Sequence, residues 1–389
     1  MKKLSIYVLA GTCIVLAVYG LLDAQGRRGQ GRRAQGRELS ALPRIVNAPA
    51  DNPSNPDKAA LGRLLFWDPI LSGKNDVACA TCHHPEAGYA ESLDLSIGVN
   101  GIGLGRNRRF GPQNDIPRVK RNSQTILNAA FNGINEAGEY NASAAPMFWD
   151  VRAKSLEEQA LKPIQALEEM RGNVYPENRA LDMVIARLKA VPEYATLFAK
   201  AFGGPNPVTP ANLGKALAAF QRTLVVTNSP FDRYMRGEAD AMTPAQIAGM
   251  NRFQRIGCMN CHLGPMFSDY QTHVLSVPEN SRLKEPDRGT DEAFAFRTPS
   301  LRNLAYTAPY MHNGVFATLD DVLEFYNDVR RGRSQNPNIN DGQLDRDLRR
   351  LNVRGRRELV EFLNALSDPS FDKTIPQRVP SGLNPGGRL

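Results

Sequence analysis

The sequence predicts a mainly α-helical fold with long loops, divided into two domains that pack together. Helix-start signals recur along the chain, and period-2 alternation long enough for a sheet is hard to find. One cysteine motif also occurs twice, once in each half of the chain. With 389 residues, the chain is long enough for two or three domains with real cores.

Several helices can be placed from their caps. Residues 209–225 form an apolar-striped helix that opens with a Thr-Pro pair. Residues 243–257 start with a capping box and end at a glycine. A third helix starts at Thr318–Asp321, and residues 356–366 form a fourth. Residues 228–237 fall between two helices, so we place the domain boundary there, after residue 235.

The start of the chain has the features of an export signal. Lys2 and Lys3 precede an apolar run over residues 4–22, which is typical of a signal peptide but nearly long enough to span a bilayer. We therefore expect an exported, periplasmic protein whose signal is cleaved. The alternative is an uncleaved anchor that tethers the protein to the membrane through this run.

Positive charge is concentrated near the same end. The formal net charge is +8, and residues 1–39 hold seven Lys and Arg against two Asp and Glu, which leaves +3 for the remainder. The excess lies in a Gly/Arg/Gln tract over residues 26–37, which is typical of a flexible tether, so nucleic acid is not an expected partner. The predicted organisation is a signal peptide or N-terminal anchor (1–24), a flexible basic tether and lead-in loop (25–55), a first domain (56–235), a second domain (236–370) and a C-terminal tail (371–389).

Two C-x-x-C-H pentapeptides, Cys79–His83 and Cys258–His262, carry the chemistry. This is the attachment motif for c-type haem, because two cysteines one helical turn apart can reach the two vinyl groups of one porphyrin edge. Zinc and disulfides are the alternatives, but a zinc site would use distant partners and a two-residue disulfide loop is strained. We therefore expect two cytochrome-c-like domains, each with one covalently bound haem c. The attachment residues are Cys79, Cys82, Cys258 and Cys261, and the iron ligands are His83 and His262.

The sixth coordination position of the first haem is predicted by counting histidines. The chain has five, and none lies between Pro85 and Cys261. His84 neighbours the proximal ligand and cannot easily reach round the ring. No local imidazole caps the first iron, so this iron can bind peroxide or another small ligand. The alternative is a distal methionine, as in an electron-transfer cytochrome.

Six blocks around the two motifs carry a resemblance to a known family. The chain resembles the bacterial dihaem cytochrome c peroxidase family and is closest to its MauG branch, over residues 61–366. Val151 departs from the pattern, because the family usually has glycine there. The matching blocks are LGRLLFWDP (61–69) with LS (71–72), RNS (121–123) with TILN (125–128), FWD (148–150) with Arg152, NSPFDRY (228–234), RTPSLRN (297–303) and APYMHNG (308–314).

The resemblance implies roles for residues near the first haem. Trp149 is expected between the two haems, where its ring can relay electrons; a core aromatic is the alternative. Gln159, Pro163 and Glu169 stand at the family's spacing for the open face of the first haem. Glu169 would act as the general acid–base in peroxide cleavage. Glu168 is the rival carboxylate, and a solvated helix face is the alternative for both.

The resemblance also implies ligands for the second haem. The family places the distal ligand fourteen residues after His312, which is Tyr326 here, as in the MauG branch. Met266 and Met311 are the fallback ligands, and a core tyrosine is the alternative role of Tyr326. Val99 stands where the peroxidase branch has a displaceable distal histidine, and this departure also favours the MauG branch.

A calcium ion between the haems is a further implication of the resemblance. Asn122 and the backbone carbonyls of Thr307 and Pro309 are its expected ligands. Oxygen ligands suit this hard cation, although three of them need waters to complete the shell.

The expected function is peroxide chemistry. We expect an exported dihaem peroxidase that reduces hydrogen peroxide to water with electrons from a small redox protein, a cytochrome c or a cupredoxin. One alternative is a MauG-like oxidase that modifies residues of a partner protein through a high-valent iron state. Another is a non-catalytic dihaem electron carrier, which would need neither Glu169 nor an open first haem.

Overall fold

The computed structural model describes residues 39–111 and 115–387. The predicted signal peptide or anchor and the Gly/Arg/Gln tract of the tether (26–37) lie outside these ranges. Within them no helix is both long and apolar enough to cross a membrane. Residues 39–389 form one compact unit, and residues 39–55 run without helix or strand.

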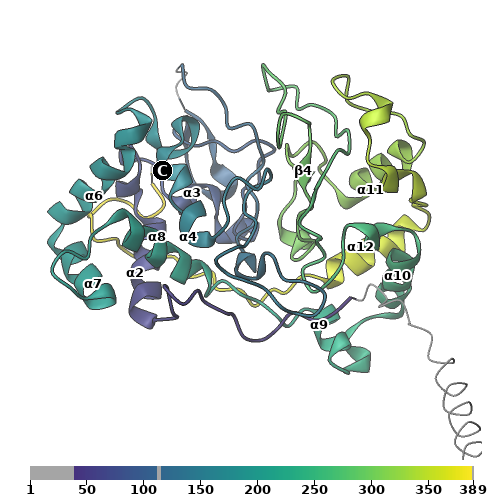
Figure 1. The fold of residues 1–389 in the computed structure, drawn as a ribbon, viewed down its shortest axis with the longest axis horizontal. Helices are drawn as coiled ribbons and strands as arrows, with labels where there is room; N and C mark the ends of the chain where they lie inside the picture. Colours follow the sequence, from purple (N-terminus) through teal and green to yellow (C-terminus); the bar gives the residue numbers. More distant parts are fainter. Residues whose placement is uncertain (1–38, 112–114, 388–389) are drawn as a thin grey trace, which may run out of the picture. The chain divides into compact units, whose positions relative to one another are not determined.

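Helices dominate the described residues, and long loops connect them (Figure 1). The strands form two short antiparallel pairs, β1 (Gly101–Ile102) with β2 (Arg109–Phe110) and β3 (Thr272–His273) with β4 (Phe296–Arg297). The predicted fold class, mainly α with long loops, is confirmed. The helices are α2 (Pro56–Trp67), α3 (Cys79–Cys82), α4 (Leu156–Gln159), α5 (Lys162–Gln165), α6 (Ala180–Ala190), α7 (Pro192–Phe202), α8 (Pro210–Gln221), α9 (Pro230–Met235), α10 (Pro244–Arg255), α11 (Leu319–Val329) and α12 (Arg356–Ala365).

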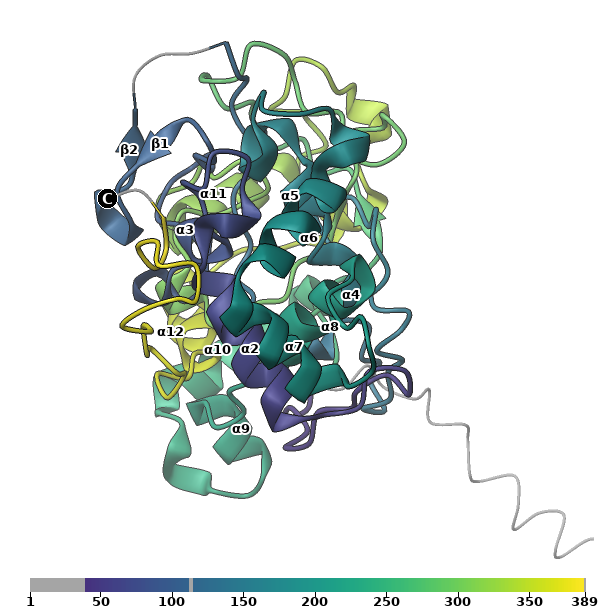
Figure 2. The ribbon, with the colours of Figure 1, turned by 90° about the vertical axis from the view of Figure 1, so that its left-hand side faces the viewer.

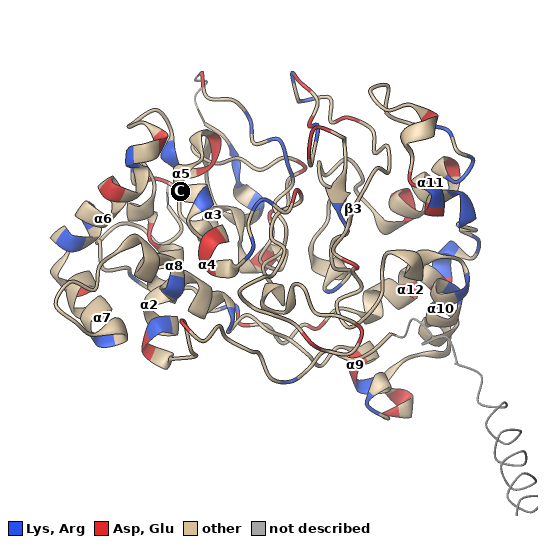
Figure 3. Cartoon of the chain, in the orientation of Figure 1, with Lys and Arg blue, Asp and Glu red and all other residues tan. Residues whose placement is uncertain are grey.

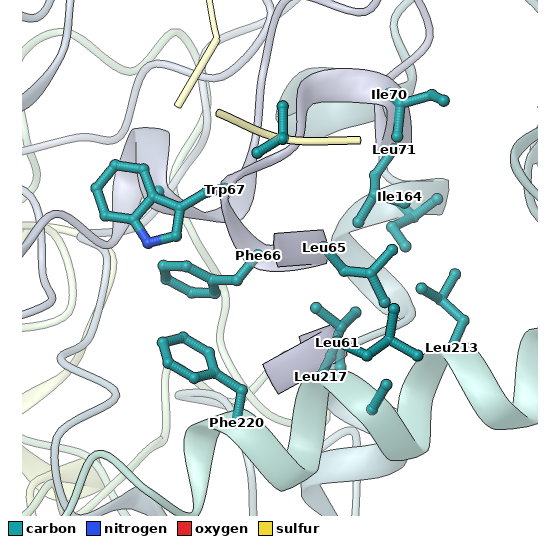
Figure 4. Packing of buried hydrophobic residues seen from close by; sticks show 14 of the residues in the cluster. Leu61, Leu65, Phe66, Trp67, Ile70, Leu71, Ile164, Leu213, Leu217 and Phe220 are labelled. Carbon is teal, nitrogen blue, oxygen red and sulfur yellow. The ribbon is translucent and has the colours of Figure 1, made fainter. Parts of the chain in front are cut away.

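The first core forms where α2 crosses α8. Leu61 and Leu65 of α2 pack on Leu217 of α8, and all three side chains are fully buried (Figure 4). The crossing is close because Gly62 has no side chain, and a Cβ there would lie 2.0 Å from the carbonyl oxygen of Ala216. Figure 2 shows α4, α6 and α7 beside this pair.

The second core repeats this arrangement with α10 and α12. A Cβ on Gly249 would lie 1.9 Å from the carbonyl oxygen of Glu358, so here too a glycine permits the crossing. Three buried rings surround it, with Phe231 and Phe362 centred 5.2 and 6.0 Å from Phe267. Because Phe231 belongs to α9, this core begins before residue 235, where we placed the domain boundary.

Helix α8 starts where the sequence predicts but ends earlier than predicted. Thr209 caps α8 by accepting a hydrogen bond from the backbone N–H of Asn212 at 3.2 Å. The helix then ends at Gln221 and does not reach Val225, so the predicted end is wrong. The reason is a long-range contact, because Asn128 donates its N–H to Leu224 O (2.9 Å) and draws the chain into an extended course.

The predicted C-terminal tail returns to the first core. Phe371 and Val379 are buried among the side chains of α2 and α8, although they follow the second half in sequence. Figure 1 shows the yellow segment leaving α12 and running to the side of the molecule that holds α2. Two hydrogen bonds fix its end: Gly386 donates its N–H to Trp67 O (2.7 Å) and accepts the Thr81 hydroxyl at its own carbonyl (2.7 Å).

Candidate haem sites and active site

The first cysteine motif forms the single helical turn α3. This turn puts Cys79 and Cys82 one above the other, and the backbone N–H of His83 bonds to Cys79 O at 3.0 Å. Thr81 fixes the turn, since its hydroxyl accepts the N–H of Ala78 at 2.8 Å. The two sulfur atoms are therefore presented on one side, as attachment to one porphyrin edge requires.

The second motif forms a similar turn, η9 (Cys258–Asn260). It begins at Gly257, whose φ of +98° is a left-handed conformation that favours glycine. The backbone N–H of His262 then bonds to Cys258 O at 2.9 Å, as in the first motif. The two turns thus offer the same set of ligand atoms in the same order.

Both motif histidines are oriented for iron. His83 directs Nδ1 at the carbonyl of Tyr89 (3.1 Å), and His262 directs Nδ1 at the carbonyl of Phe267 (2.9 Å). An Nδ1–H donated to a carbonyl leaves Nε2 as the ligand atom, which is the arrangement usual for metal-bound histidine. Burial lowers the pKa of both rings, so each is held neutral, as ligation needs. The residues fit haem.

The alternatives for the cysteines are less consistent with this geometry. None of the four forms a disulfide. Among the described residues, one group of three side chains could chelate a metal, and it contains Cys261, Asp269 and His273 but no second cysteine. The C-x-x-C pairs therefore do not assemble as zinc sites.

One cavity of about 680 Å³ joins the two sites. Its walls include His83, His262 and, between them in sequence, Trp149. Most of the predicted site residues line this cavity, although they come from separate segments. They are Cys82, His83, Asn122, Trp149, Gln159, Pro163, Glu168, Glu169, Cys258, Cys261, His262, Met266, Thr307, Pro309, Met311 and Tyr326.

Trp149 is held by backbone contacts from both halves. Its indole N–H donates to Asn122 O (3.1 Å), and its own carbonyl accepts the N–H of Arg297 (2.7 Å). Asn122 in turn donates its N–H to His312 O (2.7 Å). The backbone of Asn122 is therefore hydrogen-bonded to both Trp149 and His312. Val151 in the same turn has a φ of +53°, which explains why a glycine suits this position.

The predicted open face of the first haem is built from α4, α5 and the following turn. Ser155 caps α4 by accepting the N–H of Glu158 (3.2 Å), and the helix ends at Gln159. Pro163 lies in the first turn of α5. Glu169 follows in a short π-helical turn, η6 (Leu167–Arg171). All three predicted side chains reach the same cavity.

Glu169 differs from an ordinary surface carboxylate. Burial, followed by the charge of Glu168, raises its pKa to about 7, against the opposing effect of Arg152. A pKa near neutrality is the value that suits a group which both accepts and donates a proton. Glu168 lines the cavity as well, so both carboxylates have access to it.

Val99 does not occupy the cavity wall. It packs against the first core, and its neighbour Gly98 lies against the backbone of Glu169, where a Cβ would be 2.3 Å from the carbonyl oxygen. His84, the other histidine of this region, contacts Trp67 edge-on at 5.8 Å between ring centroids. Neither position supplies an imidazole to the open face of the first haem.

Tyr326 is near the second motif. It lies on α11, whose first turn is a capping box between Thr318 and Asp321. Burial raises the pKa of its phenol. The side chain lines the same cavity as Cys258 and Cys261. Ionisation of this phenol would need the charge of a bound metal ion. Met266 and Met311, the fallback ligands, also line the cavity.

The sequence did not reveal two polar groups beside the motifs, the half-buried His273 and the buried Glu91. His273 contacts Asp269 through Nε2 (3.0 Å) and Asp345 through Nδ1, and the hydrogen bond to Asp269 leads the effects that raise its pKa. Glu91 is 2% exposed, and burial raises its pKa to about 7. The i, i+4 spacing of Asp269 and His273 was the one local signal available.

His312 is buried in the block that precedes Tyr326. Its ring stacks on Phe296 at 3.7 Å between centroids and meets Trp149 edge-on at 6.5 Å. Burial lowers its pKa to about 3, so the ring is neutral. The neutral imidazole of His312 is therefore held in place beside Trp149 by ring packing.

The comparisons with known proteins agree with this geometry. A family profile described as di-haem cytochrome c peroxidase matches residues 56–240. The methylamine utilization protein MauG of Methylorubrum extorquens is 34% identical over 375 residues, 95% of each chain. The chain belongs to the di-haem cytochrome c peroxidase family.

Other members of this family have peroxidase names. Cytochrome-c peroxidase IdrP1 of a Pseudomonas species is 34% identical over 378 residues, 87% of this chain and 89% of that protein. Cytochrome c551 peroxidase of Pseudomonas aeruginosa is 32% identical over 307 residues, 76% of this chain and 79% of that protein. As a member of the di-haem cytochrome c peroxidase family, the protein is an oxidoreductase that carries two haem groups.

Solved structures confirm the fold of the di-haem peroxidases for this chain. A MauG-like protein associated with microbial copper homeostasis superposes with a TM-score of 0.65 at 24% identity, over 87% of this chain and 96% of that one. The diheme peroxidase BthA from Burkholderia thailandensis gives a TM-score of 0.62 at 24% identity, over 90% and 99%.

Proposed function

We propose that the protein reduces hydrogen peroxide to water at the haem of His83, with electrons that enter through the haem of His262. The observation that carries this proposal is the placement of Glu169 in one cavity with His83, with a pKa of about 7. A dihaem electron carrier has no use for a half-buried carboxylate whose pKa lies near neutrality. Two observations support the roles proposed for the site residues: the resemblance to the family and their position around one cavity.

The residues of the chain handle protons and orientation. Bound haem supplies an iron centre that coordinates peroxide and exchanges electrons with it. Glu169 accepts a proton from the bound peroxide at a carboxylate oxygen and returns it to the departing oxygen, which leaves as water. Gln159 offers an amide to the same cavity, and Pro163 adds an apolar wall. Trp149 bridges the two haem sites and can relay electrons between them.

The remaining features belong to the same proposal. Both haems are attached through thioether bonds to the four motif cysteines, and the protein is exported to the periplasm. A small redox protein, a cytochrome c or a cupredoxin, supplies the electrons. Asn122, Thr307 and Pro309 reach one cavity and could together hold a calcium ion, with waters that complete its shell.

A second candidate function is oxidation of residues in a partner protein. The position of Tyr326 in one cavity with both cysteines of the second motif favours it, as does the 34% identity to a MauG protein. Tyrosine ligation would favour oxidised iron in the second haem.

Steady-state turnover separates these functions. Purified protein is mixed with hydrogen peroxide and reduced cytochrome c, and cytochrome oxidation is followed by absorbance. Sustained turnover with two cytochromes oxidised per peroxide supports the peroxidase. Reaction with peroxide that is not followed by cytochrome oxidation would favour the second candidate.

A further inference from the structure

The surface beside the second haem motif is rich in arginine. Residues 328–357 contain nine arginines and four aspartates, without lysine or glutamate, although the chain beyond residue 39 carries only +3. Figure 3 shows the blue segments between α11 and α12 and at the end of α10. We call the following exposed residues the arginine collar: Arg331, Arg333, Arg346, Arg349, Arg350 and Arg354.

Most of this positive charge is not neutralised. Arg350 pairs with Asp347 at 3.2 Å. The other five arginines have no carboxylate of the described residues within ion-pair distance. Two of the nearby aspartates bind other groups, since Asp345 contacts His273 and Asp341 accepts the N–H of Ser334. Asp328 lines a small pocket together with Arg331. An excess of one sign at a surface creates a field that attracts a partner of the opposite sign.

The collar is built into the wall of the second haem site. Leu348 and Leu351, which lie between its arginines in sequence, line the cavity together with Cys258 and His262. A Cβ on Gly257, the residue before Cys258, would lie 3.3 Å from the Leu351 side chain and 3.7 Å from Arg350 O. The same short segment therefore touches the haem motif on one side and carries the arginines on the other.

The two ends of the collar are joined by close packing at glycines. A Cβ on Gly332 would lie 3.3 Å from the Arg349 side chain, which places the loop after α11 beside the segment before α12. A Cβ on Gly355 would lie 2.6 Å from the guanidinium of Arg252, which adds α10 to the same surface. The arginines thus form one surface and are not scattered along the chain.

The first haem motif also has exposed basic residues near it, among them Arg106, Arg109 and Arg118, but the motif itself is covered. The C-terminal segment covers it, since Gly386 accepts the hydroxyl of Thr81 within that motif. Electron transfer between proteins falls steeply with distance, so a donor must dock where little protein separates it from a haem. The second motif offers a charged surface on the segment that packs against Gly257, directly before Cys258.

We infer that the arginine collar docks a small electron-donor protein with an acidic face, which delivers electrons to the haem of His262. This inference rests on the proposed function, because it names the partner class for the same electron-entry site. Complexes of this kind bury little area and depend on charge for fast association, as expected for repeated turnover. The docked donor is oxidised by one electron in each encounter, and the second haem is reduced by the same electron.

The test uses one donor in two charge forms. Reduced basic cytochrome c and the same cytochrome after succinylation of its lysines carry the same haem but opposite surface charge. With peroxide in excess at low ionic strength, kcat/KM should be at least about tenfold higher for the succinylated form, and high salt should abolish the difference. Arg346→Glu with Arg354→Glu should remove this preference, and neither side chain forms a hydrogen bond or ion pair with another described residue. Arg331→Glu with Arg333→Glu is a second variant in case the first fails to fold.

Controls separate this inference from the proposed function. Arg179→Glu with Lys189→Glu makes the same charge change on exposed residues around α6 and should leave the preference intact. Hydroquinone, a small neutral reductant, should support peroxide reduction equally in all variants. If wild type reduces no peroxide with hydroquinone, the proposed function fails.

Binding measured without turnover tests the collar itself. Calorimetric titration of the oxidised protein with oxidised succinylated cytochrome c should give saturable binding that the collar variants lose. Suppose that the protein reduces peroxide with hydroquinone but shows no preference between the two cytochrome forms, or that the collar variants keep the preference. Either result overturns the docking inference and leaves the proposed function intact. So does binding of wild type to phosphatidylglycerol vesicles without binding to the cytochrome, because the collar would then face a membrane.

Discussion

Replacement of Glu169 by glutamine tests the acid–base assignment directly. The amide has nearly the shape of the carboxylate but cannot accept and return a proton. Loss of a general acid–base group typically slows a reaction by about 10²–10⁴-fold, which corresponds to about 3–5 kcal/mol in the barrier. We expect the rate constant for reaction of the variant with hydrogen peroxide to fall within that range, and the absorption spectra of both haems to be preserved.

The pKa of Glu169 adds a second signature. The carboxylate must be ionised to accept the proton from peroxide, and its pKa is about 7 because burial disfavours the charge. The ionised fraction then rises from about 0.1 at pH 6 to about 0.9 at pH 8, so the rate constant should rise about tenfold over this interval. Glu169→Gln should lose this rise along with its rate.

Stopped-flow absorbance of the oxidised protein mixed with peroxide measures both effects. Glu168→Gln is the matched control, since this neighbour lines the same cavity and carries the same group. The control should keep most of the rate at neutral pH. Its pH profile should keep the rise but move to lower pH, because the charge of Glu168 contributes to the raised pKa of Glu169. If Glu169→Gln reacts at the wild-type rate and Glu168→Gln is slow, the assignment is refuted and Glu168 is the acid–base residue.

Three further predictions concern the haems and the backbone. Intact mass after acid–acetone extraction should equal apoprotein plus two haems, and a mass with fewer would refute covalent attachment at both motifs. EPR of the oxidised protein should show one high-spin haem, at His83, and one low-spin haem ligated by His262 and Tyr326; two low-spin signals would mean that another ligand closes the first site. Tyr326→His should keep the high-spin signal. Val151→Gly should raise the free energy of unfolding by about 1 kcal/mol in thermal denaturation, because it relieves a left-handed β-branched residue, and no gain would show that the turn tolerates valine.

Stability should also depend on pH through the second haem site. The aspartates around His273 raise its pKa in the folded protein above the ordinary 6.5. Its contribution to stability is therefore complete below about pH 6.5 and is lost as the pH rises through the folded value. The difference in melting temperature between wild type and His273→Gln should be largest in mild acid and shrink in alkali. A difference that grows with pH would contradict the ion pairs.

The sequence predicted those features that depend on residues a few positions apart, such as helix caps and tight turns. The capped starts of α8, α10 and α11 form as expected, because a cap is made by residues three or four apart. The haem-attachment turns are local for the same reason. The end of α8 was misplaced because Asn128, far away in sequence, holds Leu224 and overrides the apolar stripe.

Site features that depend on distant partners were not predicted. His273 is fixed by Asp345, 72 residues away, and nothing in either neighbourhood marks the pair. The buried position of Glu91 was likewise not visible. By contrast, the family spacing of Gln159, Pro163 and Glu169 led to three side chains on one cavity, because α4, α5 and η6 are consecutive short elements.

The return of the C-terminal segment affects the order in which the protein can mature. The Thr81 hydroxyl must wait for a carbonyl 305 residues further along the chain, and Phe371 and Val379 complete a core that begins at Leu61. The first domain therefore cannot reach its final packing until the last residues of the chain are available, so folding of this domain depends on nearly the whole length of the protein.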